Sequence, residues 1–115
     1  LIDDENYPGG AAESKMPEGL TGALYLIYPA NKKKKFFTNN WNTAKIVKKG
    51  NTVEHWLNGA KILSYKLGSK DFKEKVGKTK FKEYPDFATA DSGYILLQDH
   101  GDVAYFKDIK IRKLK

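Results

Sequence analysis

The sequence has no cysteine, one arginine and no long apolar run. The absence of cysteine excludes disulfides, thiolate catalysis and any zinc or iron–sulfur site with cysteine ligands. No stretch approaches the roughly 18–20 apolar residues that span a membrane, so we expect no membrane span. The Gly-rich phosphate loop, HExxH and GxSxG motifs are absent as well. His55 and His100 are the only histidines, which excludes a three-histidine metal site within the chain.

The net charge of +7 comes almost entirely from lysine, because Arg112 is the only arginine among 21 basic residues. Residues 1–31 carry five acids against Lys15, a net charge of −4, which leaves +11 on residues 32–115. A basic chain with 2 tryptophans, 7 tyrosines and 6 phenylalanines has features of a nucleic-acid binder. Specific base and phosphate contacts usually use arginine, however, and these lysines are dispersed. We therefore predict a solvated lysine-rich surface and no nucleic-acid partner.

The length of 115 residues is enough for one domain, which we place over residues 1–115. Hydrophobic residues make up 40% and charged residues 30%, which is too apolar for a disordered chain. Residues 1–21 contain repeated proline and glycine and are expected to be irregular. The runs 23–28, 93–98 and 103–114 are rich in strand formers. Residues 69–81 have the pattern of one short surface helix, with Ser69 as its N-cap and an interruption at Gly77.

The clearest signal is a three-stranded antiparallel meander over residues 41–65. Asn58-Gly59 separates two strand-like runs, and this dipeptide favours a type I′ turn because both central residues need positive φ. A second, softer turn is expected at Lys49-Gly50-Asn51. A two-residue loop predicts three cross-strand pairs: Leu57 with Ala60, His55 with Ile62, and Val53 with Ser64. The face formed by these six residues then meets the core, and the other face carries Glu54, Trp56, Lys61, Leu63 and Tyr65.

The predicted elements amount to half of a sandwich. The runs 23–28 and 93–98 are apolar on both faces, so each needs cover on both sides. A single sheet of this size would leave one layer uncovered. We therefore expect a mostly β, incomplete domain whose N-terminal half lies outside these residues.

Four segments together resemble one known family. Their order and approximate spacing across nearly the whole chain are similar to those of the 3-keto-disaccharide hydrolase domain family, and Leu-Gln-Asp-His-Gly at 97–101 is the most specific part. The resemblance implies an antiparallel jelly-roll sandwich of the concanavalin A-like lectin/glucanase type, of which this chain is the C-terminal half. The segments are Gly22-Ala23-Leu24-Tyr25, Trp41-Asn42 with the strand that follows, Leu57-Asn58-Gly59, and residues 93–101 leading to Phe106-Lys107-Asp108-Ile109-Lys110-Ile111.

The resemblance also implies a carbohydrate partner and cleavage of glycosides oxidised to a ketone at C3. Such a ketone acidifies the proton on C2, so a base can remove it while the glycosidic oxygen leaves from C1, and water then adds. The enolate needs an acid or a divalent metal, whose identity the sequence does not give. The same fold serves non-catalytic carbohydrate-binding modules, which is the alternative function. Export by glycan-degrading bacteria is common in the family and implies a periplasmic or extracellular location.

The most specific segment supplies the candidate catalytic residue. On the expected strand 93–98, Tyr94, Leu96 and Gln98 share one face, and His100 joins them if the strand continues. A glutamine and a histidine at one strand end suit hydrogen bonding to a sugar and proton transfer. The alternative is that His100 caps its turn through a backbone carbonyl, with Asp99 or Asp102 nearby.

Other candidates are aromatic or polar residues elsewhere in the chain. Tyr25 and Trp41 are candidate sugar platforms, with core packing as the alternative for Trp41. Asn42 either binds ligand or satisfies a loop backbone. The acidic pair Asp3-Asp4 either holds a metal or substrate or lies in a solvated loop. His55, on the apolar face of the meander, is expected to be a hydrogen-bonded core histidine and not a catalyst.

Overall fold

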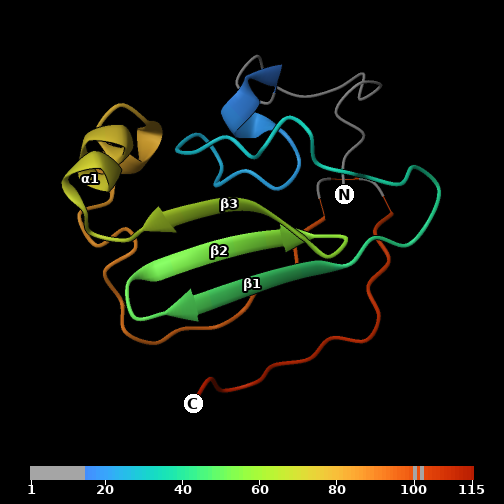
Figure 1. Ribbon diagram of the computed structural model, residues 1–115. Helices are drawn as coiled ribbons and strands as arrows, with labels where there is room; N and C mark the ends of the chain where they lie inside the picture. Colours follow the sequence, from blue (N-terminus) through green and yellow to red (C-terminus); the bar gives the residue numbers. More distant parts are fainter. Residues whose placement is uncertain (1–14, 100, 102) are drawn as a thin grey trace.

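The computed structural model describes residues 15–99, 101 and 103–115. Figure 1 shows one antiparallel meander with residues 15–35 along one side and α1 beside the end of β3. The regular structure of the described residues is mostly β, with one short α-helix, and none of its helices is long and apolar enough to cross a membrane. In chain order the elements are η2 (Pro17–Gly19), β1 (Ala44–Lys49), β2 (Thr52–Leu57), β3 (Ala60–Lys66), α1 (Lys70–Val76) and η3 (Lys80–Glu83).

The meander has the predicted strand order β1-β2-β3 and the predicted turns. Asn58 and Gly59 adopt φ of 49° and 82°, which is the double positive φ of a type I′ turn. Gly50 in the β1–β2 turn also has positive φ, at 56°. Because asparagine and glycine tolerate this region better than other residues, the sequence alone located both hairpins.

A β-bulge changes the predicted register of β2 and β3. Leu57 pairs with Ala60 as expected, but His55 pairs with Leu63 and Val53 with Tyr65. The shift lies between His55 and Trp56, where Ile62 is the extra residue of β3. The predictions that His55 opposes Ile62 and Val53 opposes Ser64 are therefore wrong. One added residue reverses the alternation beyond it, so Tyr65 joins the core face and not the outer face.

The segment before the meander covers this core face. Its predicted strand over residues 23–28 is wrong, because Leu24 and Tyr28 instead form an isolated bridge across a tight turn. Leu26 has φ of 63° within the turn, and Ile27 is only 3% exposed. The Asn31 amide donates to the Ile62 carbonyl at 2.8 Å, which joins the segment to β3. The turn thus supplies an apolar side chain to the core without adding a strand to the sheet.

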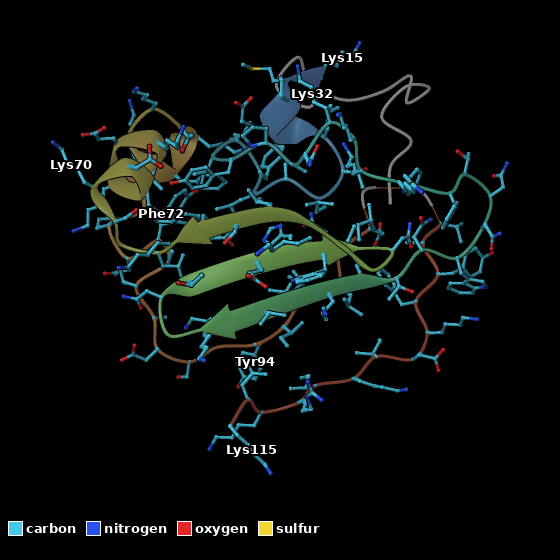
Figure 2. The ribbon with its side chains drawn as sticks, viewed as in Figure 1. Lys15, Lys32, Lys70, Phe72, Tyr94 and Lys115 are labelled. Carbon is cyan, nitrogen blue, oxygen red and sulfur yellow. The ribbon has the colours of Figure 1, made fainter. Side chains whose placement is uncertain are left out.

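Helix α1 begins where the sequence predicted. Ser69 is the N-cap, and its Oγ accepts a hydrogen bond from the Phe72 amide at 3.1 Å. The helix ends at Gly77, whose amide donates to the Lys73 carbonyl at 3.0 Å. Phe72 is 4% exposed and lies between the helix and the sheet (Figure 2), so this short helix contributes to the core.

Stacked aromatic rings join the helix, the turn and β3. The rings of Tyr28 and Tyr65 lie 5.5 Å apart, and Phe72 lies 6.4 Å and 6.3 Å from them, measured between ring centroids. The Tyr28 hydroxyl donates to the Asp71 carboxylate on α1. Burial, followed by the hydrogen bond and charge of Asp71, raises the pKa of Tyr28 to about 12.

His55 is hydrogen-bonded at both ring nitrogens, as predicted for a core histidine. Its Nδ1 lies 2.8 Å from the Gly22 carbonyl oxygen, so this nitrogen donates, and its Nε2 lies 3.2 Å from the Tyr65 hydroxyl. A neutral imidazole satisfies both contacts when Nε2 accepts from the phenol. The histidine therefore connects the segment before the meander to β3 and has no free nitrogen for catalysis.

The segments 93–98 and 103–114 form no strand, which contradicts the prediction for both. Their apolar side chains are exposed, including Tyr94, Leu96, Val103 and Ile111. Figure 2 shows Tyr94 and Lys115 on the trace that runs beside the meander and not within it. Strand formers need a partner strand to satisfy their backbone groups, and within the described residues the sheet ends at β1 and β3.

We predict that Gly22→Ala destabilises the protein by about 1–3 kcal/mol. Gly22 has φ of 83°, and a Cβ there would lie 2.3 Å from Ile62 Cδ1. Urea unfolding measures the change, with Gly93→Ala as the matched control because its Cβ would meet nothing within 4 Å. Equal midpoints for the two variants would contradict the close approach between Gly22 and Ile62.

We also predict a loss of stability between pH 10 and about 12 that depends on Tyr28. The folded state holds the phenol neutral, so its contribution is complete below the ordinary tyrosine pKa and is lost as pH rises through the folded value. Absorbance titration near 295 nm should show Tyr28 ionising late together with Tyr65, whose pKa is also raised by burial, and Tyr28→Phe should reduce the late change in absorbance by one tyrosine. Asp71→Asn should lower the pKa of Tyr28, because the carboxylate charge is one of its causes; an unchanged titration in that variant would refute the assignment.

Candidate functional site

Asn58 holds the loop before β1 against the β2–β3 turn. Its Oδ1 accepts from the Thr43 amide at 2.9 Å, and its own amide donates to the Thr43 carbonyl at 2.8 Å. Its Nδ2 donates to the Lys35 carbonyl at 2.9 Å and to Asn42 Oδ1 at 2.8 Å. The Asn-Gly sequence thus fixes a distant loop as well as a turn, a role that sequence reasoning missed.

Asn42 completes this hydrogen-bonded network. Its Nδ2 donates to the carbonyls of Phe37 at 2.8 Å and Asn40 at 3.2 Å, and its Oδ1 also accepts from the Phe37 amide at 2.8 Å. Of the two roles left open for Asn42, the structure shows the one that satisfies a loop backbone. Its side chain therefore fixes the position of the neighbouring Trp41.

Trp41 is 50% exposed, so the alternative of core packing does not describe it. Lys107 Nζ lies 4.3 Å from the centroid of its ring, which brings the C-terminal segment to the loop. The backbone amide of Trp41 donates to Asn40 Oδ1 at 2.7 Å. An exposed indole on a hydrogen-bonded loop is able to stack on a sugar ring.

Tyr25 lies in a different part of the molecule from Trp41. It is 39% exposed on the 24–28 turn, and Lys80 Nζ of η3 lies 5.3 Å from its ring centroid. Figure 1 shows η3 near α1, at one end of the sheet. The β2–β3 turn, where Asn58 holds the loop of Trp41 and Asn42, lies at the opposite end. No interaction among the described residues joins Tyr25 to that loop.

The most specific sequence segment is only partly visible. Gln98 is exposed, and Asp99 Oδ1 accepts from the Gly101 amide at 3.0 Å, which closes a local turn. His100, like Asp3 and Asp4, lies outside the described residues. Among the residues that the structure does describe, no group of three or more histidine, aspartate or glutamate side chains could hold a metal ion.

A cluster on the outer face of the sheet was also missed. Trp56 Nε1 donates to Glu54 Oε2 at 2.9 Å, and Lys61 Nζ donates to Glu54 Oε1 at 3.0 Å. Lys45 Nζ lies 4.2 Å from the centroid of the Trp56 ring. The hydrogen bonds from Lys61 and Trp56 lower the pKa of Glu54. Alternation along β2 placed Glu54 and Trp56 on one face, and this was the available signal.

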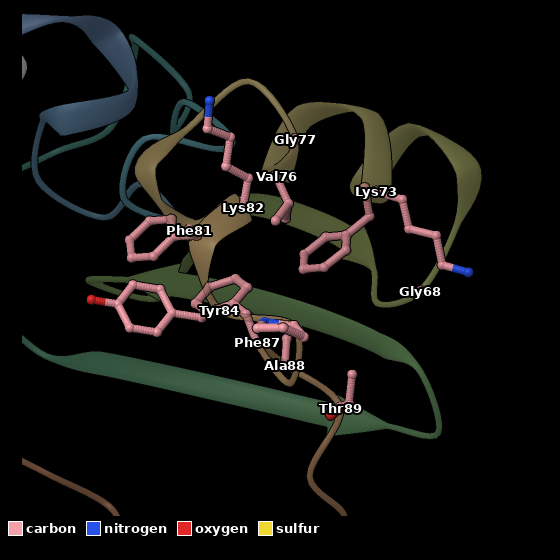
Figure 3. Close-up of a pocket in the computed structure, with 12 residues that line it drawn as sticks. Gly68, Lys73, Val76, Gly77, Phe81, Lys82, Tyr84, Phe87, Ala88 and Thr89 are labelled. Carbon is pink, nitrogen blue, oxygen red and sulfur yellow. The ribbon is translucent and has the colours of Figure 1, made fainter.

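A cavity of about 390 Å³ lies between α1, η3 and the turn after η3 (Figure 3). Phe81 and Phe87 stack beside it with ring centroids 4.6 Å apart, and Phe72 forms part of its wall. Figure 3 shows the ammonium groups of Lys73 and Lys82 pointing away from its centre. The cavity offers apolar contact but no converging acid and base.

Comparison with known proteins gives consistent matches. The model of the 3-keto-alpha-glucoside-1,2-lyase-like domain matches residues 2–112. A protein named 3-keto-disaccharide hydrolase from Bacteroides thetaiotaomicron is 29% identical over an alignment 124 residues long with its gaps. The alignment covers 99% of this chain and 42% of that protein. A crystal structure described as a "putative glycosyl hydrolase" from Parabacteroides distasonis ATCC 8503 matches with a TM-score of 0.63 and 36% identity, over 75% of this chain and 41% of that one.

The chain therefore spans less than half the length of the relatives it matches, at 42% and 41% of them. The family match, in contrast, extends over nearly all of its 115 residues. It includes the segments that carried the resemblance, from Gly22 to Ile111. This chain belongs to the 3-keto-alpha-glucoside-1,2-lyase-like domain family.

Proposed function

We propose that the protein cleaves the glycosidic bond of disaccharides or glycosides oxidised at C3. The observation that carries this proposal is the family match over residues 2–112, together with a relative named as a 3-keto-disaccharide hydrolase. The exposed indole of Trp41, on a loop fixed by Asn42 and Asn58, supports a carbohydrate ligand.

The proposed reaction is an elimination followed by hydration. A base removes the C2 proton, and the electron pair forms a C1–C2 double bond as the glycosidic oxygen leaves with a proton from an acid. Water then adds to C1 and a proton returns to C2, so that the net reaction is hydrolysis. The ketone makes this route possible because it stabilises the negative charge that develops when the proton leaves.

In this proposal His100 is the catalytic base, and Gln98 hydrogen-bonds a substrate hydroxyl. Trp41 stacks on a sugar ring, Tyr25 contacts a more distant part of the substrate, and Asn42 acts at the loop that carries Trp41. A divalent metal would stabilise the enolate if residues of the same domain outside this segment supply its ligands. We place the protein in the periplasm or outside the cell.

A carbohydrate-binding module is the second candidate. It is favoured by one observation: the described residues present exposed aromatic rings at Trp41 and Tyr25, and no group of three or more histidine, aspartate or glutamate side chains among them could hold a metal ion. Such a module would bind 3-keto-disaccharides and release no product.

We also propose that the chain is the C-terminal half of a concanavalin A-like jelly roll. The exposed apolar segments 93–98 and 103–114 have strand-forming sequences without strand partners among the described residues. Relatives more than twice as long have enough additional chain to supply those partners. Pairing would bury side chains such as Leu96 and Ile109 between two sheets.

Amide hydrogen exchange tests this pairing in the full natural polypeptide. We expect residues 94–98 and 104–112 to be protected to the same degree as β2, because paired strand amides exchange only when the pairing opens. Residues 84–92, which are a loop in either case, are the internal control. Exchange at 94–98 as fast as in that loop would refute the jelly-roll assignment.

Product analysis in D₂O tests the reaction. We expect release of monosaccharide from a 3-keto-disaccharide but not from the same disaccharide with a hydroxyl at C3. Elimination and hydration also place deuterium on C2 of the product, whereas direct displacement at C1 leaves the C2 proton in place. The free product incubated without enzyme corrects for spontaneous exchange.

Variants then separate the proposed roles. His100→Gln should lower kcat by about 10²–10⁴-fold, the usual contribution of a general base. Trp41→Ala and Gln98→Ala should act mainly on KM, and Lys70→Gln on α1 is the control. Binding of the 3-keto-disaccharide without any product would instead establish the binding-module alternative.

A further inference from the structure

The outer face of the meander carries a strong excess of positive charge. The register places Lys45 and Lys49 of β1, Lys61 and Lys66 of β3, and Glu54 of β2 on the same side as Trp56. Among the described residues the only ion pair of these lysines is Lys61 with Glu54. Three lysines therefore remain to attract an anion on a face opposite the buried side chains of β2.

Trp56 is fixed within this charged face. Its indole N–H donates to Glu54, whose other carboxylate oxygen accepts from Lys61. Two ammonium groups lie near the ring, Lys45 at 4.2 Å and Lys61 at 6.0 Å from its centroid. The ring therefore has a set orientation, which lowers the conformational entropy that the Trp56 side chain would lose when a ligand stacks on it.

We propose that this face binds an acidic carbohydrate, a glycan with carboxylate or sulfate groups. One sugar ring stacks on Trp56, taking the position of Lys45, and Lys45 turns to pair with the acid group. The other lysines pair with the next acid groups along the chain, and the Glu54 carboxylate accepts from a sugar hydroxyl. That the ligand is a carbohydrate rests on the proposed function, whereas its negative charge is inferred from the lysines of this face.

The lysines also favour a carbohydrate acid over nucleic acid. An ammonium is a compact point charge, suited to a single carboxylate or sulfate, and this face has no arginine for bidentate phosphate contacts. One tryptophan provides a single stacking position, whereas single-stranded nucleic acids are usually bound by several aromatic rings in succession.

Calorimetry with oligogalacturonate tests the proposal, and its methyl ester is the probe with the same sugar but no charge. We expect binding to the acid form that weakens with salt, and binding to the ester that is at least tenfold weaker. Trp56→Ala should weaken binding roughly five- to tenfold, the scale of one aromatic contact. Lys45→Gln with Lys49→Gln should weaken binding and reduce its salt dependence. These lysines are exposed, so the double variant keeps the proposal testable if Trp56→Ala does not fold.

Matched substitutions elsewhere provide the controls. Lys70→Gln and Lys78→Gln remove the same charge near α1, and Tyr84→Ala removes an exposed ring beside η3. Equal affinity for the ester, or equal losses in the control and the double variant, would overturn the proposal. Equal affinity for single-stranded oligo-dT would overturn the carbohydrate assignment. Cleavage of 3-keto-disaccharides is measured on the same preparation. Cleavage without binding of oligogalacturonate would overturn this inference but not the proposed function. Binding of oligogalacturonate without cleavage would overturn the proposed function but not the anionic binding site.

Discussion

The bulge at Ile62 determines which side chains of β3 reach the core. It allows Ile62 to remain buried and rotates Tyr65 onto the same face, where its hydroxyl meets His55 and its ring stacks on Tyr28. Through these contacts the sheet holds both the turn that precedes it and the helix that follows it. The buried cluster is small, so each of these contacts has few substitutes. A regular β3 would place Tyr65 on the outer face and leave α1 without its aromatic contact to the sheet.

Elements with their own local chemistry could be predicted from the sequence, and elements that depend on distant partners could not. Asn58-Gly59 specifies its turn through positive φ, and Ser69 specifies the start of α1 through a side-chain cap. The bulge has no such local signature, because it depends on the packing of Ile62 with Ala30 and Leu57 and on its close approach to Gly22. The run 23–28 is apolar enough for a strand but closes as a turn, since periodicity in six residues does not distinguish the two.

The candidate site shows the same division. The sequence predicted that Trp41 and Asn42 are both candidate site residues. The structure shows that the Asn42 side chain hydrogen-bonds the loop backbone and that the Trp41 ring is exposed on this loop. The cluster of Glu54, Trp56 and Lys61 needs the register of two strands, so single-sequence reasoning could place its members on one face without predicting their contacts. His100 was predicted from strand alternation together with the resemblance and lies outside the described residues, and Gln98 is exposed on a segment whose strand character depends on partners.

The two faces of this small sheet therefore differ in polarity: one packs against the core and the other carries charged side chains. The inner face is apolar and hydrogen-bonded through His55, so it tolerates little change in shape. The outer face is charged, and its tryptophan is half-buried, with an indole N–H that donates to the Glu54 carboxylate and with Lys45 Nζ 4.2 Å from the ring centroid. Asn58 connects the sheet to the loop of Trp41, because the residue whose positive φ forms the β2–β3 turn also fixes that loop with its side chain. Substitution of Asn58 would thus move the exposed indole of Trp41, which we propose stacks on a sugar ring, so the chemistry of a turn also determines the position of a side chain outside the sheet.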